Sequence, residues 1–328
     1  MKTFIKIWLL TYLLSMISCQ IQHPEIKADF IKPEKYQQLL GAGIDVNWAQ
    51  FNKIIDKYNA QIPADFKKKG FDHVRIRVKN SANNFILTHL NTIVDDCLKN
   101  NLIPIIAYTA DDFKENPNES NRDNVIQWWK TVAAYFKDKS PLLSFDIIVE
   151  VTDKLNREPG KLNDLYERVV SEIRKTNPNR IIFISPVVRS APEKLNLLKI
   201  PTKANGFLMA EWHFYASGPS KTNPKKLWTT GTDAEKQLIL NKINTAVNWQ
   251  HKTGIYTWVG AWMPGNYNKG NDYTIAEQVP FARFVTCQLK KARIPFAINA
   301  DIKFYDFNTY QWRYRKKVLQ AILQPNCK

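Results

Sequence analysis

The chain has 328 residues, a formal net charge of +17 at pH 7 and 44% hydrophobic residues. It contains no linker rich in glycine, serine or proline and no low-complexity tract, so one large domain is expected rather than two. It also lacks cysteine or histidine pairs at metal-ligand spacing, a nucleotide-binding loop and a covalent cofactor motif, so we predict no metal and no obligatory cofactor.

The first residues are typical of an export signal. Met1–Lys6 is short and basic, and Ile7–Ile17 is apolar but too short to span a membrane as a mature helix. Met16 to Cys19 resembles a bacterial lipobox, in which Cys19 would become the lipidated first residue; the alternative is an ordinary signal peptidase site. We therefore expect a lipoprotein-type signal over residues 1–18, a catalytic domain over residues 19–328, and export to the bacterial periplasm or outer membrane.

The basic charge predicts an anionic partner. For an exported protein that partner is not nucleic acid, and membrane contact is expected only through the lipid anchor. A cationic cleft concentrates anionic substrates by long-range steering, so an acidic oligosaccharide or polysaccharide is the expected partner. The protein itself is expected to be a monomer. The alternative is that the lysines are merely solvated surface residues.

Strand and helix patterns alternate along the whole chain. Apolar periodicity predicts helices over 86–98, 123–136 and 161–175, with Cys97 and Cys287 in apolar helical patterns as core residues. Capping boxes at Thr232–Glu235 and Thr274–Glu277 open two further helices. The predicted strands are 39–47, 71–78, 102–108, the segment from Ser144, 181–185, 207–215, 255–262 and 294–301. This alternation predicts a single-domain (β/α)8 TIM barrel, and the alternative, a doubly wound sheet, is disfavoured because no phosphate loop follows the first strand.

The segment Ser144–Asp153 is the centre of the functional prediction. It is an apolar, β-branched run that nevertheless carries Asp146 and Glu150. On a strand these carboxylates share one face, and Glu150 falls at the carboxyl end, where a barrel of this kind places its chemistry. The alternative is a carboxylate satisfied by a neighbouring arginine or backbone donor.

Short motifs in the expected order resemble glycoside hydrolase family 5, the cellulase family. Phe145–Val151 is similar to the Phe-Glu-Leu-x-Asn-Glu-Pro segment whose second Glu is the family's catalytic acid/base, and Glu150 matches it. His213-Phe214-Tyr215 matches the strand-six His-x-Tyr, Arg75 matches the strand-two Arg, and Gly43–Trp48 is similar to the family's opening. The resemblance covers nearly the whole mature chain and implies a glycan-processing barrel.

The departures from that pattern concern the chemistry. In the family, strand seven ends in a Glu that is the nucleophile, but Ala261 stands at that position here. Val149 replaces the Asn before the acid/base, and the strand-eight Trp is replaced near Asn299. The ordinary retaining mechanism, which needs two carboxylates about 5 Å apart, is therefore not expected.

The remaining groups fit a β-elimination on a uronic acid. Such a reaction needs a cation on the uronate carboxylate, a base for the C5 proton and an acid for the group leaving C4. The guanidinium fork of Arg75 matches the geometry of a carboxylate. Glu150 or His213 is the expected base. The acid is then Tyr215, or whichever of Glu150 and His213 is not the base. The alternatives are a buried ion pair of Arg75 with Asp45 or Asp146, and a core histidine tied to Glu150 or Glu211.

Further residues are predicted to contact the sugar. Glu211 shares the inner face of strand six with His213, and Arg77 shares a face with Arg75. Trp262 could form a stacking platform, although packing in the barrel is the alternative. The expected substrate-binding set is Arg75, Arg77, Glu211, Trp262 and Asn299.

Three functions are ranked on these grounds. The first is a carbon–oxygen lyase or oligosaccharide dehydratase acting on uronate-containing glycans, similar in chemistry to the enzymes of ulvan-degrading bacteria. The second is a glycoside hydrolase in which Glu211 or Asp301 takes over the missing carboxylate role. The third is a glycan-binding pseudoenzyme that has kept the barrel without turnover.

Overall fold

The computed structural model describes residues 30–214, 228–265, 273–313 and 315–327. Eight parallel strands form a closed barrel in sequence order, with the last strand paired to the first. This architecture confirms the predicted (β/α)8 TIM barrel. The strands are β1 (Ala42–Ala49), β2 (His73–Val78), β3 (Ile103–Tyr108), β4 (Ser144–Asp146), β5 (Ile182–Ile184), β6 (Leu208–His213), β7 (Thr257–Trp262) and β8 (Phe296–Ile298).

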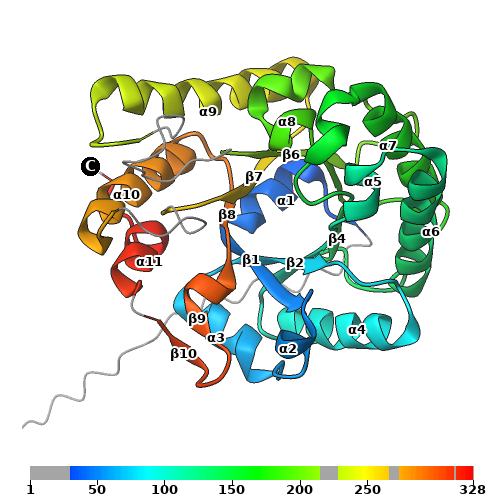
Figure 1. Cartoon of the computed structure of the whole chain (residues 1–328), viewed down its shortest axis with the longest axis horizontal. Helices are drawn as coiled ribbons and strands as arrows, with labels where there is room; N and C mark the ends of the chain where they lie inside the picture. The colour runs from blue at the N-terminus through cyan, green and yellow to red at the C-terminus, as the bar shows by residue number, and fades with distance from the viewer. Residues whose placement is uncertain (1–29, 215–227, 266–272, 314, 328) are drawn as a thin grey trace, which may run out of the picture.

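The helices surround the ring of strands (Figure 1). Both predicted capping boxes are present, with Thr232 and Thr274 as the N-caps. The long helices are α4 (Asn84–Lys99), α6 (Glu119–Tyr135), α7 (Pro159–Arg174), α9 (Asp233–Thr253) and α10 (Ile275–Lys291). The shorter elements are α2 (Asn52–Ile55), α3 (Gln61–Lys69), α5 (Asp111–Glu115), η1 (Asp153–Arg157), α8 (Val187–Ser190), η2 (Pro192–Leu197), η3 (Asp301–Lys303), β9 (Tyr305–Asp306), β10 (Gln311–Trp312) and α11 (Lys316–Leu323).

One short helix closes the amino end of the barrel. In α1 (Pro33–Leu40), Tyr36 and Leu40 are fully buried and belong to the same apolar cluster as Phe183 and Trp258, which lie on the strands. The Tyr36 hydroxyl donates to the carbonyl of Leu142 and contacts Ser144 Oγ, both at 2.8 Å. Because this end is plugged, a substrate must enter from the carboxyl ends of the strands.

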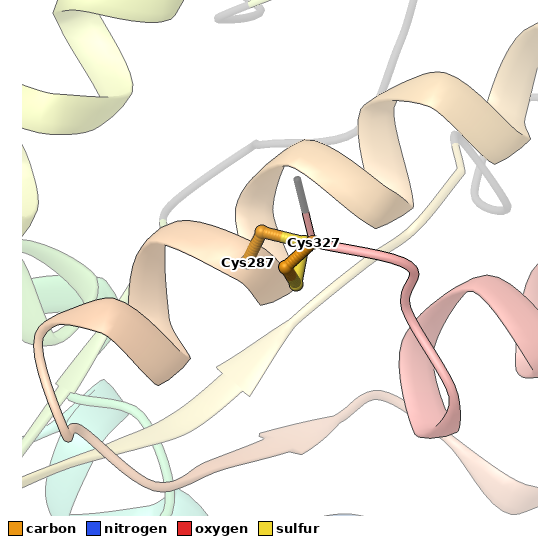
Figure 2. Close-up of a disulfide and its surroundings, with 2 residues drawn as sticks. All are labelled: Cys287 and Cys327. Atoms are coloured by element: carbon orange, nitrogen blue, oxygen red, sulfur yellow. A yellow bond between two sulfur atoms is a disulfide. The ribbon is translucent and has the colours of Figure 1, made fainter.

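A disulfide joins the end of the described chain to the barrel. Cys287 on α10 bonds to Cys327, which lies beyond α11 (Figure 2). The expectation that Cys287 is a core residue was therefore wrong, because pairing with a cysteine forty residues away gives no local signal in the sequence. Cys97 is free and buried, as predicted. In the described part of the chain no helix is both long and apolar enough to cross a membrane.

Candidate active site

A cavity of about 70 Å³ opens at the carboxyl end of the barrel. The cavity is lined by side chains from β1 and β2. The other lining residues lie at the carboxyl ends of β6 and β7 or in the segments that follow β4, β6, β7 and β8. Six predicted site residues line this cavity: Arg75, Arg77, Glu150, His213, Trp262 and Asn299. Tyr215 lies outside the described residues, so its predicted role as an acid stays a prediction. Cys19 and the signal segment also lie outside the described residues.

Glu150 reaches the cavity through a turn rather than a strand. β4 ends at Asp146, and the backbone of Glu150 is left-handed, with φ of 49°. The expectation that Asp146 and Glu150 share one strand face was therefore wrong. Asp146 is fully buried, whereas the Glu150 side chain is 34% exposed and lies 3.4 Å from Arg189 Nη1. Glu150 is thus the accessible carboxylate among the described residues that line the cavity.

Arg75 is engaged by three carboxylates in the barrel interior. Its Nε and Nη2 each donate to Asp45 at 2.8 Å, and Nη1 donates to Asp146 at 3.2 Å and to Glu211. Its side chain is 1% exposed. The alternative of a buried ion pair is therefore the arrangement present, and this geometry does not support the predicted contact with a uronate. The cause is that β1, β4 and β6 all direct a carboxylate inward around one guanidinium.

This cluster holds more negative than positive charge. Burial, reinforced by the charge of Glu211, raises the pKa of Asp146 well above its ordinary value. Burial also raises the pKa of Glu211 to about 7, against the opposing effect of Arg75. Both shifts have the same physical reason, since a desolvated cluster with surplus negative charge favours a bound proton. The cluster therefore retains a proton under conditions where an exposed carboxylate has lost it.

His213 connects the buried cluster to the cavity. Its Nε2 lies 2.6 Å from Glu211 Oε1, which is the predicted alternative of a histidine tied to Glu211. Burial, followed by the charge of Arg75, lowers the pKa of His213 to about 4, so the imidazole is neutral at neutral pH. Glu211 Oε1 already accepts from Arg75 Nη1, so a proton held by this carboxyl group lies on its other oxygen. Oε1 therefore accepts from the ring as well, which assigns the ring proton to Nε2 and leaves a lone pair on Nδ1. Glu211 itself is fully buried, so its predicted direct contact with substrate is not available in this structure.

The end of β7 completes this side of the cavity with a methyl group. Ala261 lines the cavity and pairs with His213 in the register of β6 and β7. The preceding residue, Gly260, lies directly against Glu211: a Cβ there would be 1.8 Å from Glu211 Oε1. The buried carboxylate from β6 therefore occupies the space beside β7, one layer below the cavity.

The opposite wall is organised by Asn47. Its side chain accepts from Arg77 Nη2 and donates to Asp301 Oδ1, both at 2.6 Å, and its backbone N–H donates to Asp301 Oδ2 at 3.0 Å. Asp301 is fully buried, and burial raises its pKa to about 6. Asp301 is as fully buried as Glu211, and Asn47 donates to both of its oxygens. It is therefore not exposed for direct contact with a sugar.

The two remaining predicted contacts differ in exposure. Trp262 is 2% exposed and packs between Phe281 and Phe296, each with ring centroids at 6.0 Å. Barrel packing, the stated alternative, is therefore its main role. Asn299 is half-buried at the cavity wall, so its contact with a ligand stays a prediction.

Sequence reasoning missed two features of this site. Asn47 bridges Arg77 and Asp301, and Arg189 pairs with Glu150. Asn47 belongs to the Gly43–Trp48 segment, but that resemblance does not predict its partners, and Arg189 lies in no motif quoted above. The pairing of Arg189 depends on a left-handed turn built from non-glycine residues, which no local pattern predicts. In the described ranges, no group of three or more histidine, cysteine, aspartate or glutamate side chains could hold a metal ion.

The closed barrel, with a polar cavity at the carboxyl ends of its strands, defines the class of (β/α)8 barrel proteins. Comparison with known proteins places the chain within one family of that class. Residues 39–295 match the model of the cellulase family, glycosyl hydrolase family 5, and the chain belongs to that family. Endoglucanase H of Acetivibrio thermocellus is 23% identical over 275 residues, which cover 80% of this chain and 30% of that relative. The chain thus spans less than a third of that relative's length.

Solved structures of endoglucanases share the fold. A hyperthermophilic endo-β-1,4-glucanase in complex with substrate is 24% identical, with a TM-score of 0.76, and the match covers 89% of this chain and 99% of that one. Cel5A of Thermotoga maritima in complex with cellobiose is 20% identical, with a TM-score of 0.76 and coverage of 88% and 99%. These likenesses establish the common barrel.

The comparisons overturn the first-ranked function. The expectation of a carbon–oxygen lyase or dehydratase was wrong, because the family and the relative with the matching sequence are glycoside hydrolases. The structure supplies a physical reason as well. Elimination needed Arg75 on a uronate carboxylate, and that guanidinium is already engaged by Asp45, Asp146 and Glu211.

Proposed function

We propose that the protein is a glycoside hydrolase that cleaves a β-linked polysaccharide, with Glu150 as the general acid. The observation that carries this proposal is the position of Glu150: it matches the family's acid/base residue, lines the cavity and keeps an exposed carboxyl group. The names of the relatives, which are endoglucanases, support a β-1,4-glucan as the first substrate to test.

The attacking group in this proposal is a water molecule. Ala261 offers no nucleophile, and its small side chain leaves room beside His213, to which it is paired. A cavity of about 70 Å³ has space for water, which needs roughly 10–15 Å³ of such volume. We therefore assign the attack on the anomeric carbon to a water held between Ala261 and the scissile bond.

His213 is the proposed base for that water. Its Nδ1 carries the lone pair, and Glu211, 2.6 Å from Nε2, stabilises the imidazolium that forms. In the reaction, the water oxygen bonds to the anomeric carbon while its proton moves to Nδ1. The bond from that carbon to the leaving oxygen breaks, and that oxygen takes the proton of Glu150. Attack opposite the leaving group inverts the configuration of the anomeric carbon.

The first experiment measures new reducing ends on a soluble β-1,4-glucan and the anomer formed first, by NMR. We expect hydrolysis with the α-anomer as the initial product. Glu150→Gln and His213→Ala should each lower kcat by about 10²- to 10⁴-fold, the usual contribution of a positioned acid or base. Asp138→Asn, a charge loss at an exposed position between α6 and β4, is the matched control and should retain activity.

Several outcomes would contradict this function. An initial β-anomer would exclude single-step attack by water and with it the role of His213. Retained hydrolysis in Glu150→Gln, with unchanged folding by circular dichroism, would remove Glu150 as the acid. Binding of glucans without new reducing ends in the wild type would favour the pseudoenzyme, which the methyl group of Ala261 also fits.

A further inference from the structure

The segment after β5 brings a guanidinium next to the proposed acid. Arg189 Nη1 lies 3.4 Å from Glu150 Oε1, and the Arg189 side chain remains 44% exposed. Arg75, by contrast, is 1% exposed and engaged by carboxylates of the barrel interior. Arg189 is thus a solvent-exposed cation next to Glu150, a residue that lines the cavity.

The backbone that carries Arg189 is strained. Val188, Arg189 and Ser190 all have left-handed φ values, of 61°, 56° and 59°. Residues with a side chain rarely adopt this conformation, and a β-branched residue such as Val188 is a clear outlier. Strain of this kind persists only where surrounding contacts enforce it, and it clusters at functional sites.

The contacts that enforce the turn tie it to Glu150. The N–H of Arg189 donates to the carbonyl of Val151, the next residue after Glu150, at 2.8 Å, and to Asn156 Oδ1 at 3.0 Å. Ser190 is fully buried beneath it. Glu150 has a left-handed backbone too, so two unfavourable turns are locked together and set the position of Arg189 relative to the acid.

We propose that Arg189 is an anion-binding residue that selects glycans carrying a carboxylate or a sulfate on the sugar whose oxygen Glu150 protonates. The proposal rests on the proposed function, since the leaving-group sugar is the one that must lie beside the general acid. A guanidinium recognises planar or tetrahedral oxyanions through paired hydrogen bonds. The anionic substituent replaces Glu150 as a partner of Arg189, and the released carboxylate takes up from solvent the proton that it then donates to the leaving oxygen.

The overall charge is consistent with an anionic substrate. The chain has 47 basic and 30 acidic residues, so an acidic glycan is attracted over long range at low ionic strength. Steering of this kind increases the encounter rate with any polyanion. Arg189 adds selection at one particular sugar, because it sits beside Glu150.

The test compares one oligosaccharide in three forms: a neutral β-1,4-gluco-oligosaccharide, its C6-oxidised uronate form and its 6-sulfated form. We measure kcat/KM for the wild type, Arg189→Gln and Arg189→Lys. The expected loss in Arg189→Gln is about 10- to 100-fold on one or both charged forms, the range for a charge-assisted hydrogen bond, and it is smaller on the neutral form, which offers Arg189 no anion. Arg189→Lys should restore part of the difference. Arg168→Gln, the same change on the outer face of α7, is the matched control.

Binding by calorimetry separates this proposal from the proposed function. If no form is hydrolysed but an anionic form binds more tightly to the wild type than to Arg189→Gln, the anion site stands and the hydrolase assignment fails. The uronate and sulfate arms identify which anion is recognised. Equal losses on neutral and charged forms would overturn the proposal and leave Arg189 as a positioning residue for Glu150. Hydrolysis of all three forms with no charge discrimination in the wild type would also overturn it.

Discussion

At the scale of single residues, the barrel interior is dominated by one arginine. Arg75 pairs with Asp45, Asp146 and Glu211, all fully buried. Removing one partner from a buried charge cluster leaves an uncompensated charge, which typically costs about 3–5 kcal/mol. Arg75 is therefore a structural residue of the site. It fixes Glu211, which in turn holds His213 at the cavity.

A second buried histidine, His73, lies at the amino end of β2. Trp258 Nε1 donates to His73 Nε2 at 3.1 Å, so the His73 ring proton is on Nδ1, which contacts the carbonyl of Leu40. Burial lowers the pKa of His73 to about 4 from an ordinary value of 6.5. Because the folded protein binds this proton less tightly than the unfolded chain, His73 stabilises the fold above pH 6.5, and this stabilisation is lost as pH falls towards 4.

We expect His73→Gln to reveal this dependence. Urea unfolding at pH 7, 5.5 and 4.5 should show the stability of the wild type relative to the variant falling by roughly 2 kcal/mol over that range, at about 1.4 kcal/mol per pKa unit. Comparison with the variant cancels the other titrating groups, including Glu211, whose raised pKa acts in the opposite direction. A difference that stays constant with pH would contradict this account.

At the scale of elements, the site depends on how two neighbouring strands fit together. Glu211 on β6 places its carboxylate against Gly260 on β7, where a Cβ would approach to 1.8 Å. This close approach lets a carboxylate lie under His213 without widening the barrel. The two strands therefore form a unit in which a backbone position on one sets the position of a functional side chain on the other.

Gly260→Ala tests that fit. Overpacking a buried position usually costs about 1–3 kcal/mol, and here it also displaces Glu211 from His213. We expect lower stability in urea unfolding together with a loss of activity. The matched control is Gly160→Ala in the first turn of α7, where the added Cβ meets nothing within 4 Å. A stable, fully active Gly260→Ala would show that Glu211 does not need this position.

At the scale of the whole molecule, a helix closes one end of the barrel and a disulfide joins the last described segment to an outer helix. α1 plugs the amino end, and the Cys287–Cys327 disulfide ties the segment after α11 to α10 (Figure 1, Figure 2). Disulfides persist in oxidising compartments, so the bond suits an exported protein. Export and lipidation at Cys19 stay predictions.

Reducing this disulfide should destabilise the fold. The bond spans a sequence separation of 40 residues, for which the loop-entropy model gives about 4 kcal/mol. We expect a lower midpoint of urea unfolding for the wild type in reductant and for Cys327→Ser with or without reductant. Hydrolysis should persist at low temperature, because the cavity lies at the carboxyl ends of the strands. An unchanged midpoint in reduced wild type would contradict the prediction.

The repeating pattern of strands and helices determined the architecture. Period-two and period-3.6 hydrophobicity report which faces are buried, and eight such alternations leave few folds other than this barrel. The same local signals located Glu150 and His213 near strand ends and identified both capping boxes. The family resemblance was also correct, because it was read from short motifs around those residues, which are local signals too.

What the sequence could not decide is which charged groups meet. The sequence alone determined the barrel and the position of Glu150 at its carboxyl end. Only the tertiary structure decided that Arg75 is sealed among Asp45, Asp146 and Glu211, and that Arg189 is the cation beside Glu150. Burial patterns are local, whereas desolvation and ion pairing depend on residues far apart in the chain that the closed barrel brings together.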